Sequence, residues 1–290
     1  MTTMVLDIGG TAIKSGLYTE EGLSEVREVP TQASMGGAHV VNRAKELIAD
    51  YRKYFPFQRI GISTAGQVDP RQGKIVYANE NIPGYTGTML KDIMEQEFRV
   101  PTAVENDVHA AAIGEAAFGA GRGIDHFVCL TYGTGVGGAI FTDGKLYSGN
   151  GFSAGVFGAI VTHPEQRDPK QSMFSGCYEK YASTTALVRQ AVERDPSLAN
   201  GRAIFARLDE PDVKLVVDQW IMEIVYGLIT IVHMMDPACV ILGGGVMEQT
   251  YVLDKIREKL YQNLIPAFHD VKIEKAQLGN RAGMLGAAVL

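Results

Sequence analysis

A unit of strand, glycine-rich turn and strand occurs twice in this chain, and it constrains the fold more than any other feature. The first copy spans Asp7–Lys14 and the second spans Thr131–Ile140. Apolar runs on either side of the turns predict the flanking strands, which are Met4–Ile8, Ile13–Tyr18, Phe127–Tyr132 and Ala139–Thr142. The second half of the chain therefore begins with the same strand–turn–strand unit as the first.

Strands alternate with helical patterns over the rest of the chain, which predicts an α/β architecture. Further strands are expected at Arg59–Thr64, Gly73–Tyr77, Thr102–Val104 and Cys239–Leu242. Helices are expected around Val40–Tyr51 and at Asp107–Phe118, Pro211–Met235 and Ala282–Leu290. The 290 residues suffice for two domains, and no low-complexity linker separates them. We therefore expect two closely joined α/β domains flanking a cleft.

Charge and cysteine content exclude several classes of function. Lys and Arg number 27 against 33 Asp and Glu, so the net charge of −6 gives no basic footprint for nucleic acid or anionic lipid. Three widely spaced cysteines are not a disulfide framework and fit a reducing compartment. The apolar stretch Trp220–Met235 contains Glu223 and His233 and is too short for a membrane span. With no secretory signal pattern at Met1–Asp7, these features predict a cytoplasmic protein that binds neither nucleic acid nor membrane.

The first turn, DIGGT over residues 7–11, combines groups that suit a bound phosphate. Adjacent glycines let backbone amides approach an oxyanion, and Thr11 adds a hydroxyl. Asp7 ends a strand and is suited to a metal-bound water, while Lys14 follows in the next strand. A Gly-Gly pair alone is more often an ordinary hairpin turn, but acid, threonine and lysine in one window favour a phosphate site.

The second turn, TYGTGVGG over residues 131–138, has four glycines among its last six residues. Such a run costs backbone entropy, and close approach to phosphate oxygens would offset that cost. It is neither a Rossmann fingerprint nor a P-loop, because a strand follows and no Gly-Lys-Ser/Thr occurs. A third cluster ends at Gly243–Gly245 and is a weak signal by itself.

An acidic and polar triplet, Glu105-Asn106-Asp107, lies between an apolar strand and an Ala-rich helix. A helix N-cap is one interpretation of Asp107. A general base that takes the proton of a hydroxyl attacking a phosphoryl group is the other. Both can hold at once, with Asn106 beside the base to hold sugar hydroxyls.

These motifs resemble, in the same order, those of the ROK family of repressors, open reading frames and sugar kinases. The likeness runs from residue 4 to the end of the chain. It implies a ribonuclease-H-like, actin-like ATPase fold whose domains are expected at residues 1–117, with 280–290 packing back on them, and at 118–279. It also implies an ATP-dependent kinase that uses Mg²⁺, with Asp107 as the base for the sugar 6-hydroxyl and Asp7 holding the metal through water.

The resemblance assigns two sets of ligand-binding residues. ATP and its phosphates would be held by Asp7, Gly9, Gly10, Thr11, Lys14, Gly133, Thr134, Gly135, Gly137, Gly138, Gly243, Gly244 and Gly245. The sugar would be held by Gly66, Asn81, Asn106, Asp107 and Glu179.

The chain departs from the family where most members carry Gly-Glu-x-Gly-His and a zinc-binding cysteine cluster. Val156 and Ala159 replace the glutamate and the histidine, and Cys177 alone remains of the cysteines. One thiol cannot form a four-ligand site, so we expect no structural zinc. His163 is a candidate sugar ligand in place of the histidine that Ala159 replaces, although a surface histidine is the simpler interpretation.

Substrate and activity remain open at this level. The loops at residues 61–69, 75–78 and 82–88 look most like a zinc-free branch that includes N-acetylmannosamine kinases, and N-acetylmannosamine is the sugar we expect. Glucokinase-like, β-glucoside-kinase-like and catalytically weakened sugar-binding proteins are the alternatives. A DNA-binding repressor would need a winged helix-turn-helix ahead of Met4, and the acidic charge disfavours it. A homodimer is expected from the resemblance.

Overall fold

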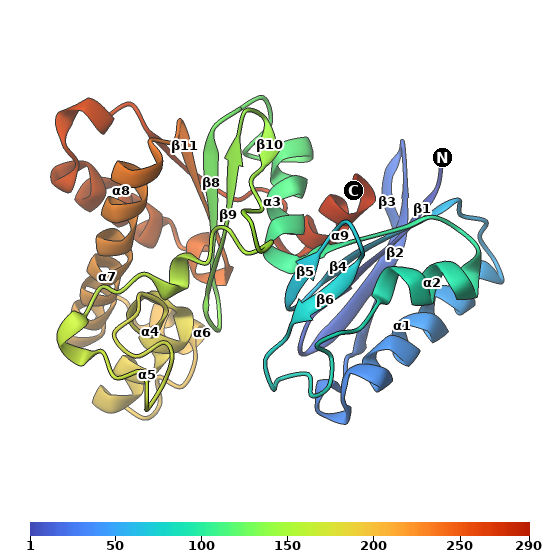
Figure 1. The fold of residues 1–290 in the computed structure, drawn as a ribbon. Coiled ribbons are helices and arrows are strands. Elements are labelled where there is room, and N and C mark those ends of the chain that lie inside the picture. Colours follow the sequence, from blue (N-terminus) through green and yellow to red (C-terminus); the bar gives the residue numbers. More distant parts are fainter. The chain divides into compact units, whose positions relative to one another are not determined.

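The computed structural model describes all residues, 1–290, and divides the chain into two compact units. The first comprises residues 1–122, 148–154 and 280–290, and the second comprises 123–147 and 155–279. Figure 1 shows the first unit from blue to green with the red C-terminal helix, and the second from green to orange. The division differs from the expected one at residues 118–122 and 148–154, which belong to the first unit.

A five-stranded sheet in the order β3-β2-β1-β4-β7 forms the centre of the first unit. β1 is antiparallel to β2, whereas β1, β4 and β7 run parallel. The elements of this unit are β1 (Thr3–Ile8), β2 (Ala12–Thr19), β3 (Gly22–Pro30), α1 (Gly37–Arg52), β4 (Arg59–Thr64), β5 (Gln67–Asp69), β6 (Lys74–Tyr77), α2 (Leu90–Phe98), β7 (Thr102–Asn106), α3 (Asp107–Phe118) and α9 (Ala282–Ala288). β5 and β6 form a separate hairpin.

Alternation along β1 assigns its side chains to the two faces of the sheet. Met4, Leu6 and Ile8 join the core cluster that contains the apolar faces of α1 and α2. Val5 packs instead with Met284 of α9 on the opposite face. Because successive side chains of a strand point to opposite faces, Asp7 lies on the α9 side of the sheet.

Glycines allow α9 to approach its neighbours at backbone distance. A Cβ on Gly286 would lie 1.7 Å from the carbonyl oxygen of Ala110 in α3, and a Cβ on Gly114 would lie 2.6 Å from that of Ala282. A Cβ on Gly61 of β4 would lie 1.9 Å from the oxygen of Ala287. Figure 1 shows α9 beside α3. The C-terminal helix therefore depends on residues without side chains to cover this face.

The second unit repeats the same strand order, β10-β9-β8-β11-β12, with β8, β11 and β12 parallel. Its elements are β8 (Phe127–Tyr132), β9 (Val136–Thr142), β10 (Lys145–Leu146), α4 (Glu179–Ala182), α5 (Thr184–Arg194), α6 (Gly201–Ala206), α7 (Pro211–Met235), β11 (Cys239–Gly243), α8 (Thr250–Asn263) and β12 (Lys272–Lys275). Six short 3₁₀ turns complete the two units, at Ala33–Met35, Phe157–Ala159, Pro164–Gln166, Gly245–Glu248, Pro266–Phe268 and Gly279–Arg281.

The longest helix, α7, is apolar enough and long enough to cross a membrane by length and composition alone. Much of it is buried inside the second unit, and Trp220 is fully enclosed. The Trp220 indole N–H donates to the carbonyl oxygens of Ala182 and Ser183 at 3.0 Å. A buried indole that binds backbone of the same unit is the pattern of a core helix.

Several elements begin or end away from their predicted limits. The predicted helices at Asp107–Phe118 and Pro211–Met235 are confirmed, whereas the last helix ends at Ala288. β9 begins at Val136, so Gly137 and Gly138 pair with Thr131 and Leu130 inside a strand. The sequence does not predict several elements, because their apolar patterns are short or interrupted by charges: β3, β5, α2, α4, α5, α6, α8 and β12.

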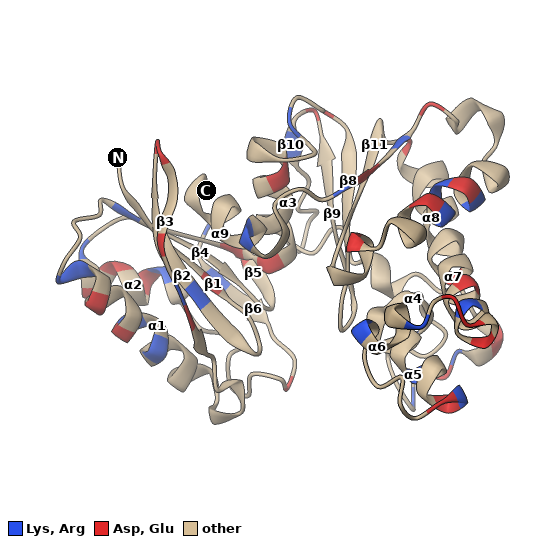
Figure 2. Cartoon of the chain, turned by 180° about the vertical axis from the view of Figure 1, so that it is seen from behind, with Lys and Arg blue, Asp and Glu red and all other residues tan.

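Acidic and basic residues are interleaved on the helices of both units (Figure 2). On α8, Lys255 pairs with Glu258 at 2.6 Å, and Arg257 lies 3.5 Å from Asp254. Exposed pairs of this kind contribute little to stability individually, but they keep the helix surface solvated.

We expect Gly286→Ala to lower the free energy of unfolding by about 2 kcal/mol or more, because the new methyl group would overlap the Ala110 carbonyl. Gly10→Ala is the matched control, since an added Cβ there meets no atom within 4 Å. Chemical denaturation of both variants measures the difference. Equal stability would mean that α9 does not pack against α3 in this way.

Candidate active site

The carboxyl ends of β1, β4 and β7 bring three polar positions together in the first unit. The register places Asp7 opposite Ser63, and Ser63 opposite Glu105. The Ser63 hydroxyl donates to Asp7 Oδ1 at 2.7 Å. Asp107 directly follows the end of β7 as the first residue of α3. Parallel strands thus place Asp7 and Asp107 at one edge of the sheet, where open α/β sheets bind ligands.

Asp107 has the features expected of a general base. Its Oδ1 accepts from the Val108 amide at 2.9 Å and from Asn106 Nδ2 at 2.8 Å, which leaves Oδ2 to accept a proton from a ligand. Burial, and after it the nearby Asp7 carboxylate, raise the pKa of Asp107 to about 6, although hydrogen bonds from Val108 and Asn106 lower it. A carboxyl with such a pKa is ionised at neutral pH and still basic enough to take a proton.

The side-chain amide of Asn106 is fully used within the protein. Its Oδ1 caps α3 by accepting from the Val108 and His109 amides at 3.0 and 3.1 Å. Its Nδ2 donates to the Gly66 carbonyl and to Asp107, both at 2.8 Å. The N-cap is therefore Asn106 and not Asp107. No amide hydrogen of Asn106 remains for a sugar hydroxyl, so this side chain positions its neighbours.

Asp7 and Lys14 lie together, as their spacing across the first turn predicts. Lys14 Nζ is 3.8 Å from Asp7 Oδ2 and donates to the Asn280 carbonyl at 3.4 Å. Burial raises the pKa of Asp7, while the Ser63 hydrogen bond and the Lys14 charge lower it. Carboxylate oxygen is the ligand type that Mg²⁺ prefers, so a partly buried carboxylate beside a lysine fits a hydrated magnesium and a phosphate.

The first glycine turn is a short hairpin connection in the structure. The Gly9 amide donates to the Ala12 carbonyl at 3.0 Å, and the Thr31 hydroxyl donates to the Gly9 carbonyl at 2.7 Å. Gly10 and Thr11 are exposed, and a Cβ on Gly10 would meet nothing. Gly10 thus leaves open space where the backbone borders the cavity described next.

A cavity of about 300 Å³ opens beside Asp107 in the first unit. Three predicted sugar-binding residues, Gly66, Asn81 and Asp107, line it together with Gly10. Gln67, Tyr77 and Asn79 also line it. Gln67 and Tyr77 lie in the loops that resemble the zinc-free branch, but none of the three is among the predicted sugar ligands. The cavity combines amide groups, an aromatic ring and a carboxylate, which is a lining suited to a polyhydroxylated ligand.

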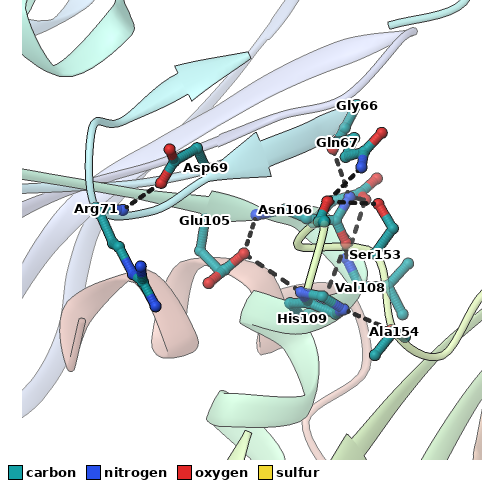
Figure 3. A network of polar contacts seen from close by, with 12 residues as sticks. Gly66, Gln67, Asp69, Arg71, Glu105, Asn106, Val108, His109, Ser153 and Ala154 are labelled. Carbon is teal, nitrogen blue, oxygen red and sulfur yellow. Dashed lines mark hydrogen bonds and ion pairs between the residues drawn. The ribbon is translucent and has the colours of Figure 1, made fainter. Parts of the chain in front are cut away.

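A segment distant in sequence, residues 148–154, completes this side of the first unit. The Gln67 side-chain amide donates to the Gly151 carbonyl, and His109 Nε2 is 3.0 Å from the Ala154 carbonyl oxygen. Figure 3 shows Gln67, His109 and Ala154 around Asn106. These bonds explain why residues 148–154 belong to the first unit.

In the second unit the glycine turn after β8 is tight. Gly133 donates to the Gly135 carbonyl at 3.0 Å, and Glu179 Oε2 accepts from the Val136 amide at 3.0 Å. A Cβ on Gly135 would lie 2.2 Å from Glu179 Oε2. Glu179, predicted to bind sugar, therefore supports this turn.

Packing accounts for one of the strand glycines predicted to hold phosphate. A Cβ on Gly138 would lie 2.3 Å from the ring of Phe157 and 2.7 Å from the Gly155 carbonyl. This position requires glycine whether or not a phosphate is near. Gly137 pairs with Thr131 in β9.

A cavity of about 930 Å³ lies at the carboxyl ends of β8 and β11 in the second unit. Gly133, Thr134 and Gly245 line it, as the sequence indicated for a nucleotide. Gly243 is buried within β11, and Gly244 adopts φ 106° with its Cα packed on the Tyr132 backbone, where a Cβ would lie 2.1 Å from the carbonyl oxygen. Residues that no motif identified also line it: Thr184, Thr185, Val188, Asn200, Arg202, Phe205 and Gln249.

His163 occupies a closed network in the second unit. Its Nε2 lies 2.9 Å from Glu223 and its Nδ1 lies 3.1 Å from Glu165, and the ring stacks on Tyr181 at 3.8 Å. Although burial disfavours its charge, the two carboxylates raise the pKa of His163. Both ring nitrogens are occupied, so neither is available to a sugar in this arrangement.

The loop around Cys177 corresponds to the zinc-binding cysteine cluster of most proteins that this chain resembles, and here protein side chains hold it. The thiol is buried 3.9 Å from the Met173 carbonyl, and no cluster of three His, Cys, Asp or Glu side chains suited to a metal occurs in residues 1–290. The Arg167 guanidinium donates to the Met173 and Ser175 carbonyls at 2.8 and 3.0 Å. Val156 is 52% exposed, and Ala159 is exposed.

Comparison with known proteins identifies the protein family. The sequence model of the ROK family matches residues 3–290. The chain belongs to the ROK family. It is 33% identical to a glucokinase of Streptomyces coelicolor, over 99% of this chain and 96% of the relative.

Two solved structures agree with this assignment. A ROK family glucokinase from Streptomyces griseus, in complex with glucose and AMPPNP, has 33% identity and a TM-score of 0.85, covering 100% of this chain and 98% of its own. A Listeria monocytogenes protein proposed to be an N-acetylmannosamine kinase has 28% identity and a TM-score of 0.88, with the same coverage. The predicted ribonuclease-H-like, actin-like ATPase fold is confirmed.

We expect the Asp107 carboxyl to titrate with a pKa of about 6 and Asp7→Asn to lower that pKa, because a neighbouring negative charge is removed. The ¹³C shift of the carboxyl carbon, followed against pH, measures both values. Asp92→Asn, on the exposed surface of α2, is the control and should leave the titration unchanged. A midpoint near the usual value of about 3.9 in the native protein would contradict this account.

Proposed function

We propose that this protein is an ATP-dependent kinase that transfers a phosphoryl group to the 6-hydroxyl of a hexose or N-acetylhexosamine. The observation that carries the proposal is Asp107, a carboxylate with one free oxygen and a raised pKa on the wall of a polar cavity. The glucokinase relatives support the class of reaction.

The chemistry assigned to Asp107 is proton acceptance. As the sugar 6-oxygen bonds to the γ-phosphorus of ATP and the bond to the β-γ bridging oxygen breaks, the hydroxyl proton passes to Asp107 Oδ2 and ADP leaves. Two donors on Oδ1 keep the carboxyl plane fixed, so Oδ2 needs no reorientation at the moment of transfer.

ATP would be bound by the two glycine turns and by the larger cavity of the second unit. The turn at Gly133–Gly135 offers backbone amides to phosphate oxygens, while Arg202 adds a cation to the cavity lining. Phe205 offers an apolar ring for the base. Asp7 would hold Mg²⁺ through water, and that ion would neutralise charge on the triphosphate.

The sugar is proposed as N-acetylmannosamine, with glucose and β-glucosides as the alternatives. The Listeria relative supports the first and the glucokinase relatives support the second. Val156 favours an N-acyl sugar, because an apolar side chain in the place of a carboxylate suits a methyl group. We further propose a cytoplasmic homodimer without structural zinc.

A catalytically weakened sugar-binding protein is the second candidate, and the exposed Val156 and Ala159 favour it. An ADP-release assay over N-acetylmannosamine, glucose, mannose, N-acetylglucosamine, fructose and a β-glucoside distinguishes the two. Turnover on any of these sugars supports the kinase. Saturable sugar binding by calorimetry without turnover supports the weakened binder.

We expect Asp107→Asn to lower kcat by roughly 10²–10⁴ and to leave the KM values for sugar and ATP nearly unchanged, since only proton acceptance is lost. Steady-state kinetics with Asp92→Asn as the control measures this. A variant that retains more than about a tenth of wild-type turnover would remove Asp107 from the role of base.

Val156→Glu tests the sugar assignment. If the pocket receives an N-acyl group, the added charge should lower activity on N-acetylhexosamines. If an ordinary hexose is the substrate, the carboxylate should instead bind it and lower its KM. The gain in binding free energy should not exceed that of one charged hydrogen bond, ~1.5–3 kcal/mol. Val161→Glu, another exposed valine of the same unit, is the matched control. Kinetics equal to wild type on every sugar would place Val156 outside the site.

A further inference from the structure

His109 has a hydrogen-bonding environment that defines its protonation state. Its side chain is 4% exposed, with Nε2 3.0 Å from the Ala154 carbonyl oxygen and Nδ1 3.4 Å from Glu105 Oε1. A carbonyl oxygen can only accept, so Nε2 must carry hydrogen. Glu105 Oε1 already accepts from the backbone N–H of Asn106 at 2.8 Å and is an acceptor for Nδ1 as well. With Glu105 ionised, both nitrogens face acceptors, and an imidazolium satisfies both.

The charges around this ring favour the same state. Burial by itself disfavours the imidazolium, but the bonds to Glu105 and Ala154 and the charges of Glu105 and Asp107 raise the pKa of His109. Glu105 faces it from β7 and Asp107 from the start of α3. The segment 148–154 presents a backbone carbonyl and contains no ionisable side chain.

The segment fastened by His109 has few other anchors. Gln67 donates to the Gly151 carbonyl, and the Arg71 guanidinium lies 5.7 Å from the centre of the Phe152 ring. Phe152 adopts φ 60°, a region that side-chain-bearing residues adopt at a cost. A segment with such a conformation persists only where its surroundings hold it, so loss of one anchor should release it.

The anchors are also part of the wall of the smaller cavity. Gln67 lines that cavity, and so does Gly66, whose carbonyl accepts from Asn106. Figure 3 shows hydrogen bonds linking Gly66, Asn106, His109 and Ala154, with Gln67 beside Gly66. Movement of residues 148–154 would therefore be transmitted to the cavity through Gln67.

We propose that His109, as an imidazolium, is a positioning residue that fastens segment 148–154 to the wall of the sugar cavity. Loss of its Nδ1 proton turns a lone pair toward the Glu105 carboxylate, and the resulting repulsion loosens the bond to Ala154. The segment is held below the pKa of His109 and released as the pH rises through it. The proposed consequence rests on the sugar kinase function: KM for the sugar rises at alkaline pH, whereas Asp107 limits kcat at acid pH.

Two variants separate positioning from a general structural role. Glu105→Gln keeps an acceptor for the backbone N–H of Asn106 but removes the negative charge beside His109. The alkaline rise in sugar KM should therefore move to lower pH. His109→Gln should raise the sugar KM roughly 10-fold or more at pH 6 and abolish its pH dependence, with the KM for ATP nearly unchanged. His126→Gln, an exposed histidine of the second unit, is the control and should match wild type.

Backbone hydrogen exchange over residues 148–154 gives a readout that needs no activity. After correction for the intrinsic pH dependence of exchange, wild-type protection should fall between pH 6 and pH 9, and Glu105→Gln should lose it at lower pH. A protein that phosphorylates no sugar would overturn the kinase proposal, while exchange still decides the role of His109. If Glu105→Gln superimposes on wild type in exchange and in any measurable sugar KM, the positioning role is overturned, even should His109→Gln fail to fold.

Discussion

The four hydrogen bonds of the Asn106 side chain hold the candidate site of the first unit together. Two of them begin α3, one fixes the orientation of Asp107, and one reaches the Gly66 carbonyl in the cavity wall. A partly buried amide with every donor and acceptor paired has one favoured orientation, because a rotation would break these hydrogen bonds. Asp107 and the cavity wall are therefore preorganised by a residue whose own polar groups are paired within the protein.

The same strand order in both units explains why ligand-binding features occur where they do. In each sheet the first three strands form an antiparallel meander and two further strands add in parallel, so the carboxyl ends of the central strands open at one edge. The first unit places carboxylates and amides at that edge, and the second places glycine turns and a larger cavity there. One topology thus provides a small polar cavity in one unit and, in the other, a larger cavity lined by a glycine turn and by side chains.

Charge within the first unit is balanced between neighbours. Asp7 and Asp107 repel each other, which raises the pKa of Asp107, while Lys14 offsets the cost at Asp7. The Glu105 carboxylate lies 3.4 Å from His109 Nδ1 and stabilises the cationic form of His109. Because these groups are partly or fully buried, their interactions are screened little by salt. The pKa of Asp107 is consequently raised by its burial and by Asp7 of β1, and lowered by its hydrogen bonds to Val108 and Asn106.

The sequence alone determined the family, the α/β class, the helices that carry Asp107 and Trp220, and the residues at the ends of the strands, because apolar periodicity and glycine turns are local signals. It did not determine which functional residues meet. Asn106, expected at the sugar, also caps a helix. His163, a candidate ligand, contacts Glu223, and Gly138, expected at a phosphate, packs against Phe157. Likewise Gln67 and His109 gain their roles from residues 148–154, far away in the chain. Hydrogen-bond partners distant in sequence leave no periodic or compositional trace, so only the tertiary structure could assign them.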